Sequence, residues 1–359
     1  MKIISYIEKI ILLIIFMSAA FVDSRTALAQ GKDYSVFRVM SYNVENLFDC
    51  AHDEGKDDTD FTPEGSMHWT ESKYRRKLHA IAEVISSVGQ WGWPALVGLV
   101  EVENDEALQA LLSYTPLGRV GYKYIMTHSP DRRGVDVALL YLPDKFKLIT
   151  SYEYQVEFSD SPDKVSRNVL HVQGQLENGA TLHAMVCHLP SRREGARKTS
   201  FFRRDATGLI REKCDSLAGV DRSVRVIIMG DFNGEPEEAA TTLELRAGLL
   251  LPHREASDIE FPPQLYNLFG KHASLNPPGS YVYKGRWTQL DQIIISQSLI
   301  LKDAPLVYKR GTARTVYIPR LVKPADNVGQ MQPYRTYLGT YYQGGYSDHL
   351  PVIADFVLQ

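Results

Sequence analysis

The feature that most constrains this chain is a short apolar run that ends in two polar residues: residues 226–234 read VIIMGDFNG. A run of this kind predicts a buried β-strand. Residues two apart on an extended chain point to the same side, so Asp231 and Asn233 can face one cavity together. Gly230 and Gly234 allow a tight turn or a close backbone approach to a ligand. A strand that simply enters a turn explains the segment equally well, because Asp, Asn and Gly are common turn residues.

The rest of the chain alternates strand-like and helix-like segments, with no obvious repeat or linker. Apolar runs and alternation predict strands at residues 36–43, 95–101, 122–127, 135–142, 168–176, 180–188, 224–233, 290–296 and 352–358. Helical spacing predicts helices at residues 74–88, 104–114 and about 197–217. Glu177-Asn178-Gly179 joins two of the strands and predicts a hairpin. Hairpins mixed with helices indicate two sheets packed face to face and covered by helices.

The first 29 residues have the pattern of a cleaved signal peptide. A basic start precedes an apolar run at residues 10–22, and residues 27–29 (Ala-Leu-Ala) match a signal peptidase site. The run has 13 residues, short of the roughly 20 that span a bilayer, so a retained anchor is the weaker alternative. We expect residues 1–29 to be removed and residues 30–359 to form a single domain that is periplasmic or secreted.

Charge and cysteine content exclude two classes of protein. The formal net charge of -3 argues against a protein that holds nucleic acid by bulk charge, so a polyanion would need a local basic patch or metal ions. The three cysteines allow at most one disulfide, which excludes a disulfide-stapled scaffold. Stability must therefore come from a packed core.

An acidic, irregular segment covers residues 52–65. A calcium loop can be built from such acids, but the spacing lacks the Gly and the closing Glu of an EF-hand. A solvated loop is the preferred interpretation.

Polar residues of the types that bind metals or transfer protons end several predicted strands, lie within the strand predicted at 290–296, or precede the last strand. These residues are Asn43, Glu101, His188, Asp231 with Asn233, Asp291, and Asp348 with His349. Each one alone has an ordinary structural explanation. A set made up only of carboxylate, carboxamide and imidazole groups indicates a shared site.

These residues make the chain resemble the endonuclease/exonuclease/phosphatase superfamily, as a bacterial exported member. The resemblance runs from Ser41-Tyr42-Asn43 to Ser347-Asp348-His349 and includes Gly230-Asp231-Phe232-Asn233. It covers nearly all of residues 30–359. The motif Gly230-Asp231-Phe232-Asn233 followed later in the chain by Ser347-Asp348-His349 is highly specific. It implies an α/β (α+β) fold, a four-layer α/β/β/α sandwich of two packed mixed sheets flanked by helices, with the site where the sheets open.

The resemblance also implies a metal site. Glu101 matches the metal-binding glutamate of the family, and Asn43 and Asp348 complete the site beside it. Oxygen ligands of this kind suit Mg²⁺ or Mn²⁺, with Ca²⁺ as a further option. The family glutamate usually follows Gln, whereas Val100 precedes Glu101 here.

The catalytic roles follow from the same resemblance. His349 matches the motif histidine and Asp291 the carboxylate that pairs with it, so His349 is expected to act as the base that activates water. Asp231 and Asn233 match the pair that faces the phosphate, and Asp231 either orients the water or protonates the leaving oxygen. His188 is expected to donate a hydrogen bond to a phosphoryl oxygen.

Basic and aromatic residues near these motifs are candidates for substrate binding. Arg133 precedes a predicted strand, and Arg192 and Arg193 follow His188 at the head of a basic cluster that also holds Arg197, Lys198, Arg203 and Arg204. Such a cluster can clamp phosphates, although a solvated helix face explains Arg203 and Arg204 equally well. Tyr346 is the best placed ring of a Tyr-rich loop for stacking on a base.

We therefore expect a monomeric metal-dependent hydrolase of phosphodiester bonds, an exported nuclease that cuts nucleic acid as an endonuclease. The alternative is a phosphatase or phosphodiesterase for inositol phosphates or phospholipid head groups. A non-catalytic binding module on the same fold is a remote alternative, because every motif residue is present.

Overall fold

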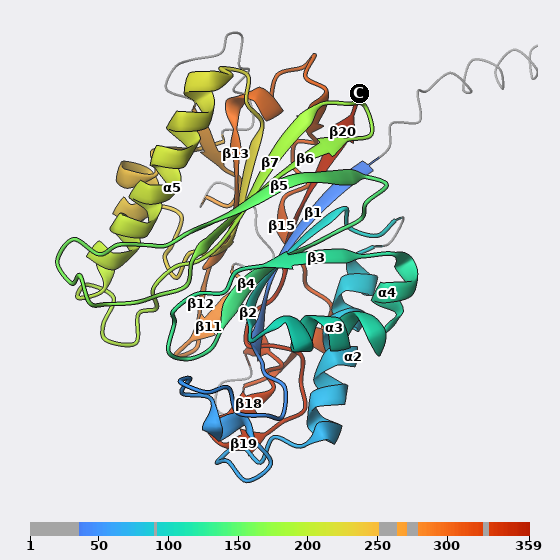
Figure 1. The fold of residues 1–359 in the computed structure, drawn as a ribbon, viewed down its shortest axis with the longest axis vertical. Coiled ribbons are helices and arrows are strands. Elements are labelled where there is room, and N and C mark those ends of the chain that lie inside the picture. Colours follow the sequence, from blue (N-terminus) through green and yellow to red (C-terminus); the bar gives the residue numbers. More distant parts are fainter. Residues whose placement is uncertain (1–35, 90–91, 251–263, 271–278, 326–329) are drawn as a thin grey trace, which may run out of the picture. The chain divides into compact units, whose positions relative to one another are not determined.

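The computed structural model describes residues 36–89, 92–250, 264–270, 279–325 and 330–359. The expected signal peptide lies outside these residues. Two seven-stranded mixed sheets dominate the described part of the chain (Figure 1). None of its helices is long and apolar enough to cross a membrane.

The first sheet is centred on a parallel pair, β1 and β2, whose outer neighbours run antiparallel to them. Its order is β14 (Leu306–Tyr308), β20 (Val352–Leu358), β1 (Val36–Leu47), β2 (Leu96–Val102), β4 (Asp136–Tyr141) and β3 (Lys123–Met126), with β15 (Arg314–Thr315) also paired to β20.

The second sheet repeats this plan around the parallel pair β7 and β8. Its order is β5 (Phe146–Tyr154), β6 (Val169–Leu176), β7 (Thr181–His188), β8 (Val226–Asp231), β13 (Asp291–Ser296), β10 (Leu265–Asn267) and β9 (Ala247–Leu249). Short hairpins outside the two sheets are β11 (Tyr281–Tyr283) with β12 (Arg286–Thr288), β16 (Val322–Pro324) with β17 (Met331–Pro333), and β18 (Tyr337–Leu338) with β19 (Tyr341–Tyr342).

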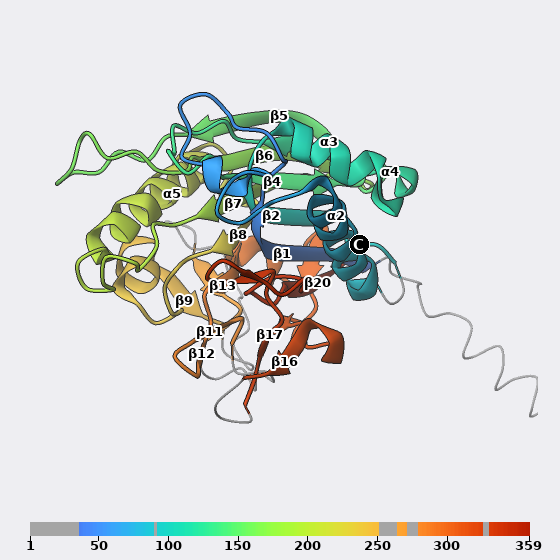
Figure 2. The ribbon, with the colours of Figure 1, turned by 90° about the horizontal axis from the view of Figure 1, so that it is seen from below.

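Helices cover the outer face of each sheet (Figures 1 and 2). The first sheet carries α2 (Glu71–Val88), α3 (Asp105–Ser113) and α4 (Pro116–Val120), and the second carries α5 (Ser200–Val220). The remaining helical turns are η1 (Thr59–Phe61), η2 (Ala240–Glu244), η3 (Gln297–Leu299) and η4 (Pro319–Leu321). The expected four-layer α/β/β/α sandwich is therefore confirmed.

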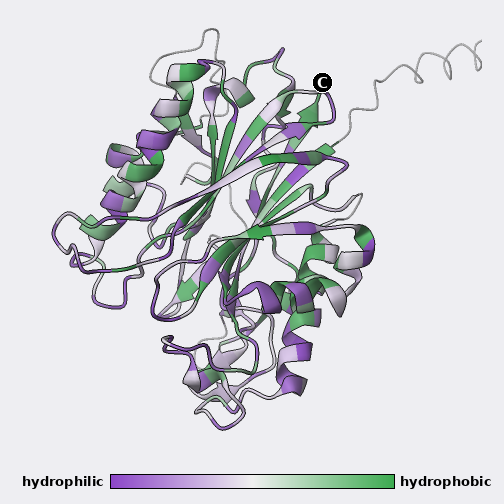
Figure 3. Cartoon of the chain, in the orientation of Figure 1, coloured by the Kyte–Doolittle hydropathy of each residue, from purple (hydrophilic) through white to green (hydrophobic). Residues whose placement is uncertain are grey.

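Three apolar cores hold the layers together. Between the sheets, Val100 of β2 and Met229 of β8 belong to one buried cluster. The sheets approach so closely that a Cβ on Gly98 would lie 2.8 Å from the Met229 sulfur. The other cores lie under the helices, with Ile81 of α2 in one and Ile210 of α5 in the other. Hydropathy follows this plan, with green concentrated along the central strands (Figure 3).

Most expected elements are present, and the deviations have local causes. The Glu177-Asn178-Gly179 hairpin joins β6 to β7, with Gly179 at a φ of 85°. Strand β5 was not expected, because it is an edge strand whose side chains are mostly exposed and give no apolar alternation. All three cysteines are free thiols.

Candidate active site

The polar residues that end the strands lie at one edge of the sandwich. Asp231 is paired in register with His188 on one side and Asp291 on the other. The C-terminal ends of the parallel strands β1, β2, β7 and β8 lie at this edge. Strand β13, which runs antiparallel to β8, begins at the same edge with Asp291. A cavity of about 580 Å³ is lined by Asn43, Glu101, Arg133, His188, Arg192, Arg193, Asp231, Asn233, Tyr281, Arg335, Asp348 and His349, among others.

Unusual backbone angles aim several of these side chains. Glu101 and Asn233 have φ values of 68° and 46°, a left-handed region that non-glycine residues rarely adopt. Strand β1 has an irregular register between Asn43 and Leu47. Such bulges and strained residues occur where a strand must redirect a side chain. The turn interpretation of the Asp231–Asn233 segment and the site interpretation are therefore both satisfied, because the turn presents the side chains.

His349 and Asp291 form a buried hydrogen-bonded pair. The His349 Nδ1 atom lies 2.6 Å from Asp291 Oδ2, which also accepts a 2.6 Å hydrogen bond from the Ser280 hydroxyl. Burial alone would lower the pKa of His349, but the Asp291 carboxylate, helped by Asp231 and Asp348, outweighs it and raises that pKa well above 6.5. These three carboxylates therefore favour the imidazolium form of His349.

Asp231 occupies the centre of the site. Its Oδ2 accepts a 3.1 Å hydrogen bond from Asn43 Nδ2 and lies 3.8 Å from His188 Nε2 and 3.9 Å from His349 Nε2. Its Oδ1 accepts a 2.8 Å hydrogen bond from the Asn233 backbone. Burial raises the pKa of Asp231 to about 6, although the charge on His349 opposes this.

His188 is neutral, in contrast to His349. Burial, followed by the nearby cations Arg167 and Arg133, lowers its pKa well below 6.5. Its Nε2 lies 3.8 Å from both Glu101 Oε1 and Asp231 Oδ2. A neutral imidazole at this place can donate one hydrogen bond into the cavity.

Glu101, Asp348 and Asn43 offer only oxygen ligands to the cavity, the donor type that Mg²⁺ or Mn²⁺ prefers. Burial would raise the pKa of Glu101, but Arg133, His349 and Arg167 outweigh it and keep the carboxylate ionised. The Asn43 Oδ1 atom accepts one hydrogen bond, from the Glu45 backbone, and keeps a second lone pair. These residues therefore fit a hard divalent ion.

A charged layer behind this ligand set was not anticipated from the sequence. Arg335 donates to Asp348 Oδ2 at 2.9 Å and to Glu45 Oε1 at 3.3 Å. Lys77 of α2 is buried and donates to the Thr336 hydroxyl at 2.6 Å. Burial lowers the pKa of Lys77 to about 8, and burial with Asp348 nearby raises that of Glu45 to about 7. The sequence held one indication of this layer: Lys77 lies on the apolar face of the helix predicted at residues 74–88.

The candidate substrate residues have diverse environments. Arg133 and the exposed Arg193 both line the cavity. Arg192 also lines it, but its Nε donates to the Asn233 carbonyl at 2.6 Å and its guanidinium pairs with Glu238, so it supports the Asn233 turn.

Tyr346, expected to meet substrate, is not among the described residues that line the cavity. Its hydroxyl donates to Glu83 of α2 at 3.2 Å. Tyr281 does line the cavity, and its ring centroid lies 4.7 Å from that of His349, at an interplanar angle of 34°. Sequence reasoning missed Tyr281 because it lies outside every motif and no local pattern marks it.

The basic cluster after His188 is partly structural. Arg203 is fully buried and donates to the carbonyls of Pro190 and Ala196, at 3.3 and 3.0 Å. Arg204 pairs with Glu244 on η2. Arg203 is therefore neither on a solvated helix face nor free to bind phosphate. Its hydrogen bonds hold the loop that follows His188.

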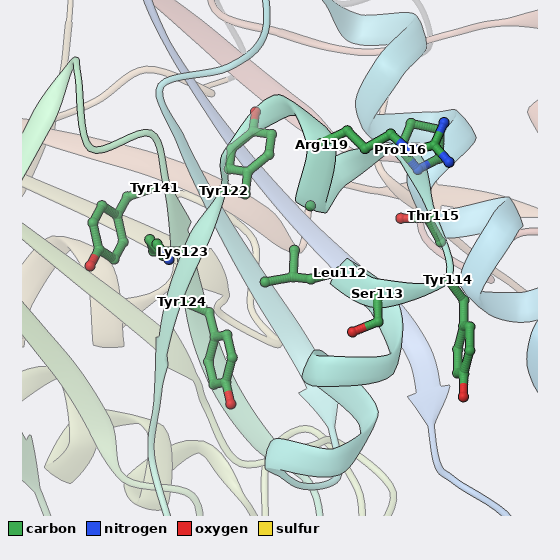
Figure 4. A pocket seen from close by; sticks show the side chains of 11 residues that line it. Leu112, Ser113, Tyr114, Thr115, Pro116, Arg119, Tyr122, Lys123, Tyr124 and Tyr141 are labelled. Carbon is green, nitrogen blue, oxygen red and sulfur yellow. The ribbon is translucent and has the colours of Figure 1, made fainter.

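A second recess, of about 810 Å³, lies at the α3–α4 connection and β3 (Figure 4). Its described lining includes Tyr114, Arg119, Lys123 and Tyr124 and contains no carboxylate or imidazole. The polar strand ends line the smaller cavity instead, so the candidate active site lies there.

Two packed sheets flanked by helices, with an acidic, histidine-containing site at one edge, are the arrangement expected of a phosphoesterase fold. The family model described as "Endonuclease/Exonuclease/phosphatase family" matches residues 38–357. The chain belongs to this family, which confirms the family named in the sequence analysis.

Solved structures share the fold at low sequence identity. The catalytic domain of human nocturnin with a bound sulfate anion is 18% identical, with 90% of this chain and 95% of that chain covered and a TM-score of 0.54. A mannosyl-6-phosphatase from Bacteroides thetaiotaomicron is 16% identical, with 90% and 100% covered and a TM-score of 0.56. TDP2 from C. elegans is 16% identical, with 94% and 81% covered and a TM-score of 0.52. The comparison with curated proteins gave no match.

Proposed function

We propose that this chain is a divalent-metal-dependent phosphodiesterase that cuts nucleic acid. The observation that carries the proposal is one cavity in which the His349–Asp291 pair and Asp231 face the oxygen ligands of Glu101, Asp348 and Asn43. A divalent ion held there would neutralise the phosphoryl oxygens and stabilise the departing oxygen. The side chains must then activate the water and position the phosphate.

Asp231 accepts the proton of the attacking water in this proposal. Its pKa of about 6 leaves it ionised at neutral pH yet basic enough to take a proton. Its central position, within 4 Å of both His188 and His349, supports this role. His349 was expected to be the base, but three surrounding carboxylates favour its charged form. We assign it to hold a phosphoryl oxygen as a charged donor.

The remaining polar groups orient the phosphate. His188 is neutral and its Nε2 faces the centre of the cavity, so it donates to a non-bridging oxygen. The Asn233 carboxamide is anchored by a 2.9 Å hydrogen bond to the Leu189 carbonyl. Arg133 adds positive charge beside Glu101, at 3.5 Å. Donors fixed before the reaction stabilise the charge that develops in the transition state.

Nucleic acid is the preferred substrate because phosphate-binding cations and aromatic rings line the same cavity. Arg133 and Arg193 can contact backbone phosphates. Tyr281 and the exposed Tyr283, both on β11, can stack on bases, and Lys284 lies over the Tyr283 ring at 5.2 Å.

A small phosphate ester is the second candidate. Arg192, Lys198 and Arg204 are neutralised by Glu238, Glu194 and Glu244, which weakens attraction for a long polyanion. Inositol phosphates or phospholipid head groups would need only the cations that line the cavity. A structural neighbour described as a mannosyl-6-phosphatase adds mannose 6-phosphate to the compounds that should be tested.

The decisive experiment measures turnover with Mg²⁺, with Mn²⁺ and with chelator against DNA, RNA, inositol phosphates, sphingomyelin and mannose 6-phosphate in parallel. Metal-dependent cleavage of DNA or RNA is expected, and it should be lost in Asp231→Asn and His349→Ala variants that remain folded. Cleavage of small esters alone would select the second candidate. Ligand binding without any metal-dependent turnover would select a binding module.

Export is also part of the proposal, supported by the signal-peptide pattern of residues 1–29. N-terminal sequencing of the protein recovered from the periplasm or the medium should begin at residue 30. Recovery of an intact N-terminus in the cytoplasm would contradict export.

A further inference from the structure

A group of acids outside the active site is brought together by the fold. Asp53 and Asp58 lie in the loop between β1 and α2, and Glu103 follows the end of β2. Each of the three residues has a carboxylate oxygen that lies within 4.8 Å of a carboxylate oxygen of both other residues. Asp58 and Glu103 are buried, with only 1% and 5% of their surface exposed.

One of these carboxylates has an oxygen without a partner. Glu103 Oε2 accepts a 2.6 Å hydrogen bond from the Asp49 backbone. Glu103 Oε1 is buried and has no hydrogen-bond partner in the part of the chain that the structure describes. An unsatisfied buried carboxylate oxygen is costly, and such atoms in folded proteins often mark an ion or a water.

The three carboxyl groups have few cationic partners in the part of the chain that the structure describes. Among the described residues, the ion pairs that involve the three carboxylates are limited to His52 with Asp58. Lys56, the lysine of the same loop, donates instead to the carbonyls of Ser129 and Asp131, at 3.0 Å each. Three carboxylates gathered in a buried place therefore favour a bound cation.

We propose that Asp53, Asp58 and Glu103 bind a structural Ca²⁺ ion, separate from the catalytic ligands. Oxygen ligands lie about 2.3–2.6 Å from Ca²⁺, so two ligands of one ion are at most about 5 Å apart. The observed limit of 4.8 Å meets this condition. Ca²⁺ is favoured over Mg²⁺ because it tolerates irregular geometry and takes several protein oxygens, whereas Mg²⁺ keeps its waters.

The ion would brace a segment that supports the active site. Asn104 donates to Asp49 Oδ2 and to Asp53 Oδ2, at 3.3 Å each, and so already links the loop to the end of β2. The Asp57 backbone donates to the Arg132 carbonyl at 2.7 Å, which joins the loop to the segment that carries Arg133. The loop lacks the closing Glu of an EF-hand, and Glu103, far away in sequence, supplies that carboxylate.

The test uses the protein in Mg²⁺ buffer and adds Ca²⁺, with the melting temperature and titration calorimetry as readouts. Saturation at about 100 times the dissociation constant should raise the melting temperature by roughly 5 °C. Terbium luminescence excited through Trp69, whose indole donates to the Phe48 carbonyl beside Asp49, should report the same site. Glu103→Gln and Asp53→Asn should each weaken binding at least tenfold.

Two further variants separate this site from its surroundings. Glu54→Gln changes an exposed acid of the same loop and should leave binding unchanged. Glu101→Gln changes the catalytic ligand set and should leave the terbium signal intact. The proposal is overturned if Glu103→Gln and Asp53→Asn, both folded by circular dichroism, bind Ca²⁺ like the wild type. It is also overturned if Glu101→Gln removes all binding, or if the wild type shows no shift.

Discussion

Replacing Asp291 by Asn tests the assignment of His349 as a charged donor. The substitution keeps the shape of the side chain and removes the charge that accepts the 2.6 Å hydrogen bond from His349 Nδ1. Asp291 is fully buried, so solvent does not screen the loss. Hydrogen bonds to charged groups contribute about 1.5–3 kcal/mol. With about 1.4 kcal/mol for each factor of ten, kcat should fall roughly 10- to 150-fold.

The pH profile gives a second, independent reading of Asp291→Asn. In the wild type, His349 must stay protonated, so activity should decline only as pH rises through its elevated pKa. Without the Asp291 carboxylate that pKa falls, and the alkaline decline should move to lower pH. If His349 were the base instead, its titration would govern the acidic limb, and that limb would move.

The assay is steady-state hydrolysis of a chromogenic phosphodiester with saturating Mg²⁺, followed across the pH range. Ser280→Ala is the matched control, because it removes the 2.6 Å hydrogen bond to Asp291 but keeps the charge; it should cost no more than about fivefold. Circular dichroism confirms that both variants are folded. A kcat for Asp291→Asn within threefold of the wild type would refute the reasoning, as would an unmoved alkaline limb.

Four further outcomes follow from the structure. For the wild type, kcat/KM should rise as pH increases through about 6, because Asp231 must lose its proton to act as the base; a flat profile between pH 5 and 7 (about one unit either side) would remove it from that role. Gly230→Ala should prevent stable folding, because the added Cβ would lie 1.9 Å from the Cys187 carbonyl oxygen on β7. If any of this variant folds, urea unfolding should show that its free energy of unfolding is lower by more than about 4 kcal/mol. Arg193→Glu should weaken DNA binding and reduce the slope of log K against log salt concentration by about one unit. Equal slopes for the wild type and Arg193→Glu would place Arg193 outside the interface. Arg192→Ala should mainly reduce kcat, because it loosens the Asn233 turn.

Local pattern was sufficient for the strands and for the polar residue types at their ends. A strand is specified by neighbours two residues apart, so the segments that became β1, β2, β7, β8 and β13 could be located from their apolar runs. Strand pairing then brings their polar ends to one edge, which is why Asp231 and Asp291 could be expected together. Strand β5 escaped because an exposed edge strand has no apolar face to detect.

The support behind the ligands could not be found in this way. Lys77, Glu45 and Arg335 belong to segments far apart in the chain, and only packing places α2 and the loop before Ser347 against the bulge in β1. The same holds for Glu103, whose neighbours Asp53 and Asp58 come from a loop interpreted as solvated. Sequence spacing carries no information about such contacts.

By itself, then, the sequence determined the sandwich of two sheets and the residue types gathered at its edge, because both follow from short-range periodicity and from motifs. The tertiary structure alone decided what those residues can do. Burial and the charges that surround each group raise the pKa of His349 well above 6.5, lower that of His188 well below 6.5 and raise that of Asp231 to about 6. The segment 226–234 is a strand that ends in a turn in either description; the groups packed around it supply its chemistry.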